Sequence, residues 1–469
     1  MNLYLPAPLI YLTIALYILG IILAVNSAFE ARTPQGTMAW ILGLTFFPII
    51  AIPLFILFGK RKLDDYVAIE EKVAELRRLF HGQLKDYFVH ENPSEIEKFL
   101  SSTEAPFVSG NKVSLLLNGT QTFEQMLEAI DSAEKYVLLQ TYIFRTDQIG
   151  KKFVQALIRR AQQGVSVYLL YENLGIEVDE TILQQLREAG VKVGEFPPMR
   201  KYKMQLNFRN HRKLLVVDGS QGIFGGINIG DDYLGLYPEI GFWRDTNIKV
   251  TGPGVIQSQI DFVKDWVWSQ GTPVEVQWAA PVATGESSVL TLTSGPADHR
   301  HFNLLQHIEV INSAKKRLWI ANPYFVPPQG LVDALFIARL RGVDVRLVIP
   351  ANKKCDNKIV STAAEVYLEQ LTQAGIRVYK YKKGMMHQKV LLIDHALAIV
   401  GSSNLDFRSM YINFENAIAT TDREFIDDTA EAFEEDFSES VEAAYADYEN
   451  RTATEKLRSH LANCLTPIL

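Results

Sequence analysis

The segment His211-Arg-Lys213-Leu-Leu-Val-Val-Asp218 occurs a second time in the chain, as His387-Gln-Lys389-Val-Leu-Leu-Ile-Asp394. Each copy is followed, at the same distance, by a turn of small residues and an asparagine, Asn228 and Asn404 respectively. The His, Lys, Asp and Asn of one copy all lie 176 residues from their counterparts. A single His-x-Lys pattern can arise by chance, but four polar residues repeated at one spacing indicate a duplicated functional unit.

The apolar runs inside the two copies, 214–217 and 390–393, are typical of strands buried on both faces. Residues two apart on an extended chain point to the same side, so each strand presents an imidazole and an ammonium group together. The glycines beyond each strand allow close backbone approach, and the asparagine adds an amide donor. Two imidazoles, two ammonium groups and two amides are suited to binding a phosphodiester and attacking it without a metal. The alternative, that each His and Lys merely ends a strand in solvent, does not explain the repeat.

The duplication extends beyond the motif. Strand-like and glycine-containing segments correspond in three further pairs: 137–144 with 318–325, 161–167 with 339–345, and 186–193 with 371–378. Alternating strands and helices, with glycine at the helix ends, predict an α/β fold with largely parallel strands. We expect two homologous halves, 105–280 and 281–469, that face each other across a pseudo-two-fold axis and share one active site. The acidic run 422–449 is expected to form an amphipathic C-terminal helix without chemistry.

The first 62 residues predict a membrane anchor, followed by an amphipathic linker over 63–104. Residues 9–25 and 37–58 carry no charge, and about 20 apolar residues span a bilayer, so two transmembrane helices are expected. A cleaved signal peptide is disfavoured because no basic region precedes the first stretch. Pro48 and Pro53 should kink or break the second stretch, which leaves a re-entrant hairpin as an alternative. Lys60-Arg-Lys62 follows directly, so the positive-inside rule places the catalytic body in the cytoplasm.

Composition limits the other classes of function. The chain has two cysteines and no C-x-x-C pattern, which argues against structural zinc or a disulfide framework. Its formal net charge of −7 argues against a general grip on nucleic acid. Two stretches, 200–213 and 377–389, contain basic and apolar residues but no acid, and each leads into a motif. We expect these basic tracks to attract an anionic lipid headgroup.

The groups in the repeat suggest a two-step displacement. One neutral imidazole, of His211 or His387, would attack phosphorus in line while the other, protonated, gives its proton to the leaving alkoxide. Lys213, Lys389 and the two asparagines would neutralise the non-bridging oxygens, with no metal required. The pseudo-symmetric pattern alone does not decide which imidazole attacks.

A nucleophilic imidazole needs an acceptor on its second nitrogen, and carboxylates serve that purpose in other sites. Glu415 is the candidate in the second half, and Asp245 is the candidate in the first, where the register slips by six residues. Asp218 and Asp394 complete the motif and so count among the candidate catalytic residues. They follow the lysines by five residues, about 17 Å along a strand, so we expect them to fix a turn or a salt bridge.

With these features together, the chain resembles the phospholipase D superfamily, whose members carry this paired motif. More narrowly, it resembles the bacterial cardiolipin synthases with two transmembrane helices, and this resemblance covers essentially the whole chain. The segments that carry it are Arg32-Thr-Pro34, Met38-Ala-Trp40, Phe242-Trp-Arg-Asp-Thr246, Asn322-Pro-Tyr-Phe-Val-Pro327, Gly401-Ser-Ser-Asn-Leu-Asp-Phe-Arg408 and Asn413-Phe-Glu415.

The resemblance implies an inner-membrane phosphatidyltransferase that joins two phosphatidylglycerol molecules and releases glycerol, without a cofactor or a metal. It favours His211 as the nucleophile and His387 as the acid and base. Anionic phospholipid and the membrane are the expected partners, nucleic acid is not, and a homo-oligomer is left open. The alternatives are a phospholipase D-type hydrolase or headgroup-exchange enzyme, a nuclease of the same superfamily, and a non-catalytic membrane scaffold. A scaffold would be expected to have lost a motif His or Lys, and none is missing here.

Overall fold

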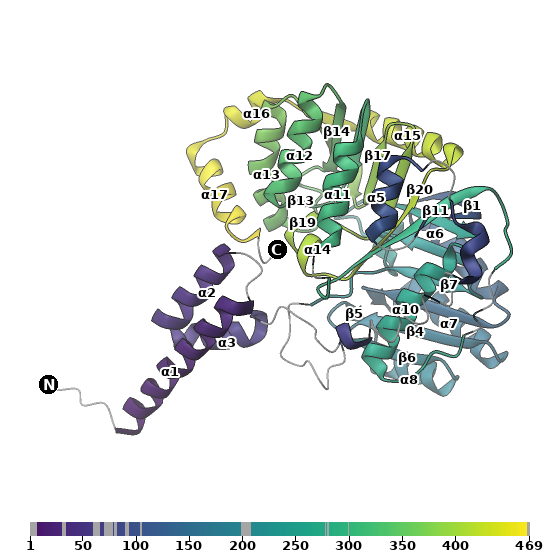
Figure 1. Cartoon of the computed structure of the whole chain (residues 1–469), viewed down its shortest axis with the longest axis horizontal. Coiled ribbons are helices and arrows are strands. Elements are labelled where there is room, and N and C mark those ends of the chain that lie inside the picture. The colour runs from purple at the N-terminus through teal and green to yellow at the C-terminus, as the bar shows by residue number, and fades with distance from the viewer. Residues whose placement is uncertain are drawn as a thin grey trace.

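The computed structural model describes residues 7–30, 34–59, 66–69, 78, 82–89, 93–103, 106–197, 208–276, 278, 281–298 and 300–466. An N-terminal group of helices projects from a larger α/β body (Figure 1). The basic triplet 60–62, Arg32 and residues 200–207 of the first basic track lie outside the described residues. The predicted domain boundaries near residues 62, 104 and 280 fall on or beside undescribed residues and stay predictions.

The N-terminal group consists of α1 (Ala7–Glu30), α2 (Pro34–Phe46) and α3 (Pro48–Phe58). Among the described residues, α1 alone is both long and apolar enough to cross a bilayer, whereas α2 and α3 are shorter apolar helices. The expectation of a second continuous spanning helix is therefore wrong. The helix is interrupted at Phe47, directly before Pro48, because proline cannot continue the hydrogen-bond ladder of the preceding turn.

The chain folds back on itself at this interruption. The rings of Trp40 and Phe55 meet edge to face with centroids 5.1 Å apart, whereas 15 residues of continuous helix would separate them by about 22 Å. A Cβ on Gly43 would lie 3.5 Å from that of Ala51, and one on Gly20 of α1 would lie 2.4 Å from the carbonyl oxygen of Leu44. The second apolar stretch is thus a helical hairpin whose tip packs against the middle of α1.

The body begins with two short helical elements and then repeats one pattern twice. The first half contains η1 (Lys85–Tyr87), α5 (Glu95–Thr103), β1 (Val108–Leu117), α6 (Asn118–Ser132), β2 (Tyr136–Thr141), β3 (Phe144–Arg145), α7 (Gln148–Gln162), β4 (Ser166–Glu172), β5 (Ile176–Glu177), α8 (Glu180–Glu188), β6 (Lys192–Phe196), β7 (Leu214–Val217), β8 (Gln221–Gly225), η2 (Asp231–Leu234), β9 (Phe242–Arg244), β10 (Thr246–Thr251) and α10 (Val255–Gln270).

The second half repeats this order and adds a C-terminal extension. It contains β11 (Ser287–Ser294), α11 (Phe302–Ser313), β12 (Arg317–Ala321), β13 (Phe325–Val326), α12 (Gln329–Leu340), β14 (Asp344–Pro350), α13 (Lys358–Gln373), β15 (Arg377–Tyr381), β16 (Gly384–Met386), β17 (Val390–Ile393), β18 (Leu397–Gly401), β19 (Leu405–Asp406), α14 (Phe407–Tyr411), β20 (Glu415–Thr420), α15 (Arg423–Ser438), β21 (Ser440–Ala443), α16 (Tyr445–Glu449) and α17 (Ala453–Asn463).

One 15-stranded sheet runs through both halves. The strand order is β1-β10-β8-β7-β2-β4-β6 in the first half and β11-β20-β18-β17-β12-β14-β15 in the second, and an antiparallel pairing of β1 with β11 joins them. The two orders match strand for strand, so the expected α/β class with two pseudo-symmetric halves is confirmed. Helices cover the sheet in both halves (Figure 1).

The alternation of strands with glycine-ended helices predicted largely parallel strands. The sheet is mixed instead, so this prediction is wrong. Within the large sheet, the parallel pairs are β2 with β4, β4 with β6, β12 with β14, and β14 with β15. The motif strands β7 and β17 form antiparallel hairpins with β8 and β18 instead. Their connecting turns are too short for the crossover that a parallel pair needs.

The acidic run 422–449 is likewise not one helix, because it forms α15, the edge strand β21 and α16. Helix α15 buries Phe425, Ile426, Phe433 and Phe437 against the body, as an amphipathic helix should. Its Asp436 is also buried and reaches the groups behind the second motif.

Candidate active site

Each motif histidine is tethered by its backbone to the opposite half of the molecule. The N–H of His211 donates to the carbonyl of Phe414 at 2.9 Å, and the N–H of His387 donates to the carbonyl of Arg244 at 2.8 Å. Strand β16, just before His387, also pairs with β9 of the first half. The motifs therefore converge where the two halves meet.

The carboxylates one residue beyond these carbonyls contact the histidine rings. Nδ1 of His211 lies 3.0 and 3.1 Å from the two carboxylate oxygens of Glu415, and Nδ1 of His387 lies 2.9 Å from Oδ2 of Asp245. Each carboxylate thus pairs with the histidine of the other half, which corrects the assignment of Glu415 and Asp245 to their own halves. The sequence could not reveal this exchange because the two backbone tethers cross the interface.

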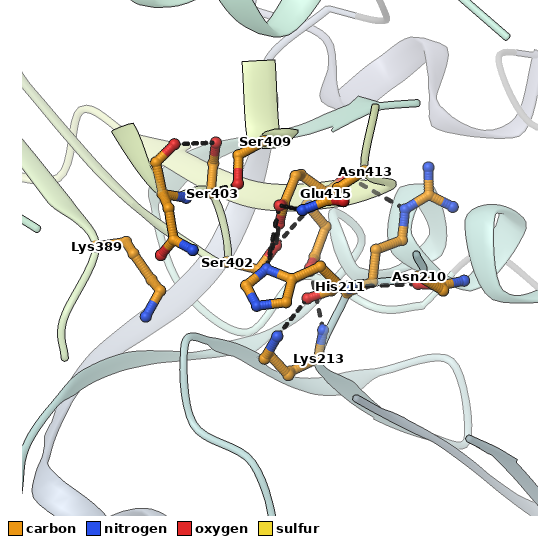
Figure 2. Close-up of polar contacts among 12 residues, drawn as sticks. Asn210, His211, Lys213, Lys389, Ser402, Ser403, Ser409, Asn413 and Glu415 are labelled. Atoms are coloured by element: carbon orange, nitrogen blue, oxygen red, sulfur yellow. Dashed lines mark hydrogen bonds and ion pairs between the residues drawn. The ribbon is translucent and has the colours of Figure 1, made fainter. Parts of the chain in front are cut away.

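The motif lysines lie beside their own histidines. Nζ of Lys213 donates to the carbonyl of His211 at 2.6 Å, and Nζ of Lys389 donates to that of His387 at 2.5 Å and lies 3.0 Å from its Nε2. Figure 2 shows Lys213 and Lys389 approaching His211 from different sides. A Cβ on Gly226 would lie 2.9 Å from Cδ of Lys389, so this glycine makes room for a lysine of the other half.

Asn228 and Asn404 both line the cleft that contains the histidines. The Asn228 amide donates to the Tyr233 hydroxyl at 2.9 Å and accepts from the N–H of Ile143 at 3.0 Å, which fixes its orientation. Among the described residues, the buried Oδ1 of Asn404 has no hydrogen-bond partner. The structure brings both amides to the site, and their role in binding phosphate stays a prediction.

Asp218 and Asp394 are not brought to the cleft with the other motif residues. Asp218 accepts three backbone N–H bonds from 134–136, each at 2.8 Å, and Asp394 accepts the equivalent three from 315–317. Both residues have a positive φ of 52° in the turn that ends the motif strand. This geometry fixes a turn, as expected, and separates the two aspartates from the candidate chemistry.

The cleft has a volume of about 660 Å³ and takes its lining from both halves. Besides the histidines and asparagines, its side chains include Tyr142, Arg145, Arg209, Asp232, Tyr233, Trp243, Tyr324, Asp356, Asp406, Arg408 and Asn413. Aromatic rings flank both imidazoles, with Tyr142 5.2 Å from His211 and Trp243 5.0 Å from His387 between ring centroids. A single cleft therefore presents both imidazoles.

Burial lowers the pKa of both histidines, although the paired carboxylate opposes the shift in each case. His211 keeps 13% of its side chain exposed to the cleft. Burial would raise the pKa of Asp245 and Glu415, but their contacts with the histidines lower it. Burial also lowers the pKa of Lys389, to about 8. The imidazoles are therefore mainly neutral beside ionised carboxylates, and an anionic substrate would favour proton uptake.

A buried polar layer behind the motifs was missed by sequence reasoning. Arg212 donates to both oxygens of Asp265 on α10 at 2.8 Å, and Arg244 donates to Asp436 on α15 at 2.7 and 3.0 Å. Gln388 also donates to Asp436, at 2.6 Å. Arg212 and Gln388 occupy the variable position between His and Lys. A usable signal existed only in the first half, where Asp265 lies among the apolar residues of α10.

The second basic track is neutralised by neighbouring acids. Arg377 pairs with Glu442 at 2.7 Å, Lys380 with Glu365 at 3.1 Å, and Lys383 with Glu439 at 2.9 Å. Met385 and Met386 of the same track are fully buried. These contacts argue against an exposed lipid track over 377–389, because its charged side chains form ion pairs at the edge of the sheet. The described end of the first track is Phe208, which is buried, and Arg209, which lines the cleft.

Comparison with known proteins agrees with this architecture. Residues 126–255 and 307–437 match the family model described as "Cardiolipin synthase, PLD-like domain", and residues 15–60 match one described as "Phospholipase_D-nuclease N-terminal". Cardiolipin synthase A of Pseudomonas putida (strain GB-1) is 36% identical over 475 residues, which cover 98% of each chain. Cardiolipin synthase A of Pseudomonas aeruginosa (strain LESB58) is 35% identical over 471 residues, which cover 98% of this chain and 96% of that protein.

A solved structure shares the fold of the body. The crystal structure of phosphatidylserine synthase from Haemophilus influenzae Rd KW20 superposes with a TM-score of 0.62 at 15% identity, covering 76% of this chain and 95% of that one. Two like halves around paired His-x-Lys motifs are the architecture of phospholipase D-like proteins. Within that class, the chain belongs to the cardiolipin synthase family, as the sequence resemblance predicted.

Proposed function

We propose that the protein is a membrane-bound cardiolipin synthase that transfers a phosphatidyl group from one phosphatidylglycerol to another and releases glycerol. The observation that carries the proposal is the pair of imidazoles from opposite halves, each held by a carboxylate, in one cleft. Family membership supports a phosphatidyltransferase. The intact set of two histidines and two lysines argues against a non-catalytic scaffold.

The reaction proceeds in two balanced steps. A neutral imidazole attacks phosphorus, the bond from phosphorus to the glycerol oxygen breaks, and the other imidazolium gives its proton to the departing glycerol. The hydroxyl of a second phosphatidylglycerol then gives its proton to that imidazole and attacks phosphorus. The bond from phosphorus to the first histidine breaks, and cardiolipin leaves. Lys213 and Lys389 stabilise the charge on the non-bridging oxygens throughout.

The test is incubation of the purified protein with phosphatidylglycerol alone, in the presence of EDTA. We expect cardiolipin and free glycerol in equal amounts by mass spectrometry, and we expect added glycerol to reverse the reaction. Phosphatidic acid as the main product would indicate the alternative, a hydrolase, in which water replaces the second lipid. A strict requirement for CDP-diacylglycerol, with release of CMP, would contradict the proposed mechanism.

The anchor supports one membrane span with the catalytic body in the cytoplasm. The tip of the hairpin formed by α2 and α3 packs against Gly20, near the midpoint of α1. The hairpin therefore enters the bilayer only about halfway and returns to the side of the body. Lys60-Arg-Lys62 follows the hairpin and marks the inner surface. The N-terminus then lies outside, in contrast to the two-span expectation.

Cysteine labelling of intact cells tests this topology after Cys355 and Cys464 have been replaced by serine. A cysteine at position 2 should react with an impermeant thiol reagent added outside, whereas cysteines at positions 33 and 62 should not. Labelling at position 33, with positions 2 and 62 protected, would restore the two-span anchor.

A further inference from the structure

The two ends of the cleft differ in charge at positions that the pseudo-symmetry relates. Arg209 and Arg408 line the end that contains His211. The positions 176 residues away from them, beside His387, are Met385 and Asp232. Two arginines at one end thus correspond to a buried methionine and an acid at the other.

The backbone fixes both arginines to the loop that carries Glu415. The carbonyl of Arg408 accepts from the N–H of Asn413, and the carbonyl of Arg209 accepts from the N–H of Phe414, both at 2.9 Å. Phe414 in turn accepts the N–H of His211 at 2.9 Å. The two arginines come from opposite halves, yet their carbonyls hold the adjacent residues Asn413 and Phe414 beside one imidazole.

The two guanidinium groups are close enough to affect each other. The pKa of Arg408 is lowered by its burial and then by the positive charge of Arg209. Of the two carboxyls that adjoin them, Asp406 is mainly ionised at neutral pH and offsets part of that charge, whereas Glu172 is mainly protonated. Glu172 lies 3.9 Å from Arg209 with its pKa raised by burial to about 8, and burial raises the pKa of Asp406 to about 6. An anion between the arginines would relieve their repulsion.

The other end of the cleft lacks this excess of positive charge. Asp232 forms an ion pair with Arg145 at 2.5 Å, and Asp356 accepts from the hydroxyl of Tyr324 at 2.7 Å. Aromatic rings of Trp243 and Tyr233 complete the surroundings of His387. An anionic group is therefore favoured at the His211 end over the His387 end.

We propose that Arg209 and Arg408 form a second anion site, separate from Lys213 and Lys389, that binds the phosphodiester of the acceptor phospholipid. The inference rests on the proposed function, because only an acceptor that is itself a phospholipid brings a second phosphate into the cleft. Guanidinium groups suit this role because their paired N–H donors match phosphate oxygens. The three carbons of the acceptor's glycerol then reach from this site to the reacting phosphorus.

The experiment compares two acceptors in the same purified full-length protein. Phosphatidylglycerol vesicles are supplied with labelled glycerol, so that cardiolipin formation and incorporation of labelled glycerol into phosphatidylglycerol are measured together. Glycerol is an acceptor without a phosphate. The variants are Arg209→Gln and Arg408→Gln, with Arg159→Gln as a matched control, because Arg159 is half exposed on α7 and pairs with Asp131 outside the cleft.

We expect each cleft variant to lower the ratio of cardiolipin formation to glycerol exchange at least about tenfold, as loss of a charge-assisted contact to phosphate should. The control should keep the ratio within about twofold of wild type. Continued glycerol exchange shows that a variant is folded, and an unchanged ratio would overturn the second anion site. A wild-type protein that performs neither reaction would instead refute the proposed function.

Discussion

The His211 end and the His387 end of the cleft carry the same reactive groups in different surroundings. At the first end, Glu415 is longer than its counterpart Asp245 and also accepts from Ser402 at 2.5 Å. At the second, the position equivalent to Ser402 is Gly226, which leaves space for Lys389. Duplication kept the imidazoles, lysines and carboxylates, while the groups that set access and charge diverged. A site with two like halves can thus treat donor and acceptor differently.

The largest effect is expected when either imidazole is removed. His211→Ala and His387→Ala should each nearly abolish turnover, and the double variant should be little worse than either, because the two groups act in one reaction. Steady-state rates of cardiolipin formation measure this. A single variant that kept activity within about tenfold of wild type, roughly 1.4 kcal/mol, would show that the two ends work independently.

Neutralising the crossed carboxylates should give the next largest loss. Glu415→Gln and Asp245→Asn keep a hydrogen-bond acceptor but no longer stabilise an imidazolium, so kcat should fall by roughly 10²- to 10⁴-fold. Asp218→Asn is the matched control, because Asp218 fixes a turn away from the cleft. It should lower the thermal stability and leave kcat within a fewfold. Equal losses of kcat in all three variants would argue that the carboxylates act only on folding.

The sequence was sufficient for the duplication, the α/β class and the imidazoles and amides that meet in the cleft, because spacing and residue type survive in a repeat. The same repeat also suggested Asp218 and Asp394, which lie outside the cleft. It did not reveal the exchange of Glu415 and Asp245, since the hydrogen bonds of His211 and His387 to the opposite half are tertiary. Burial of Asp436 was hidden because an acid on an acidic helix reads as solvated. The break at Phe47 was anticipated from Pro48. The folding of α3 back onto α2 was not, because it depends on the tertiary contact between Trp40 and Phe55.

The buried ion pairs behind the motifs should affect stability more than chemistry. Asp265→Asn leaves Arg212 buried without its counter-charge, and Asp436→Asn does the same to Arg244, so each should cost about 3–5 kcal/mol of folding free energy. Thermal or denaturant unfolding of the purified variants in detergent gives the measurement. The two pairs are not symmetry-related, because the counterpart of Arg212 is Gln388, which donates to Asp436 alongside Arg244. A loss below about 1 kcal/mol for either would mean that its arginine finds another partner.

The smallest effect tests the divergence at one position. Gly226→Ser gives the first half the residue of the second, and its Cβ would lie 2.9 Å from Cδ of Lys389 and 3.2 Å from Oδ1 of Asp245. The displaced lysine should lower kcat by about tenfold. Ser402→Gly, the reverse exchange, removes one hydrogen bond to Glu415 and should raise the activation free energy of the reaction by only about 1 kcal/mol. Equal effects in the two directions would mean that the ends are interchangeable.

The central claim is that both halves build one active site, and the number of phosphatidyl groups held per chain tests it most directly. Rapid mixing of the enzyme with saturating phosphatidylglycerol should release an initial burst of glycerol equal to one molecule per chain. Intact-mass analysis of the quenched protein should show at most one phosphatidyl adduct. A burst of two glycerol molecules per chain, with adducts on His211 and His387 of the same chain, would contradict a shared site.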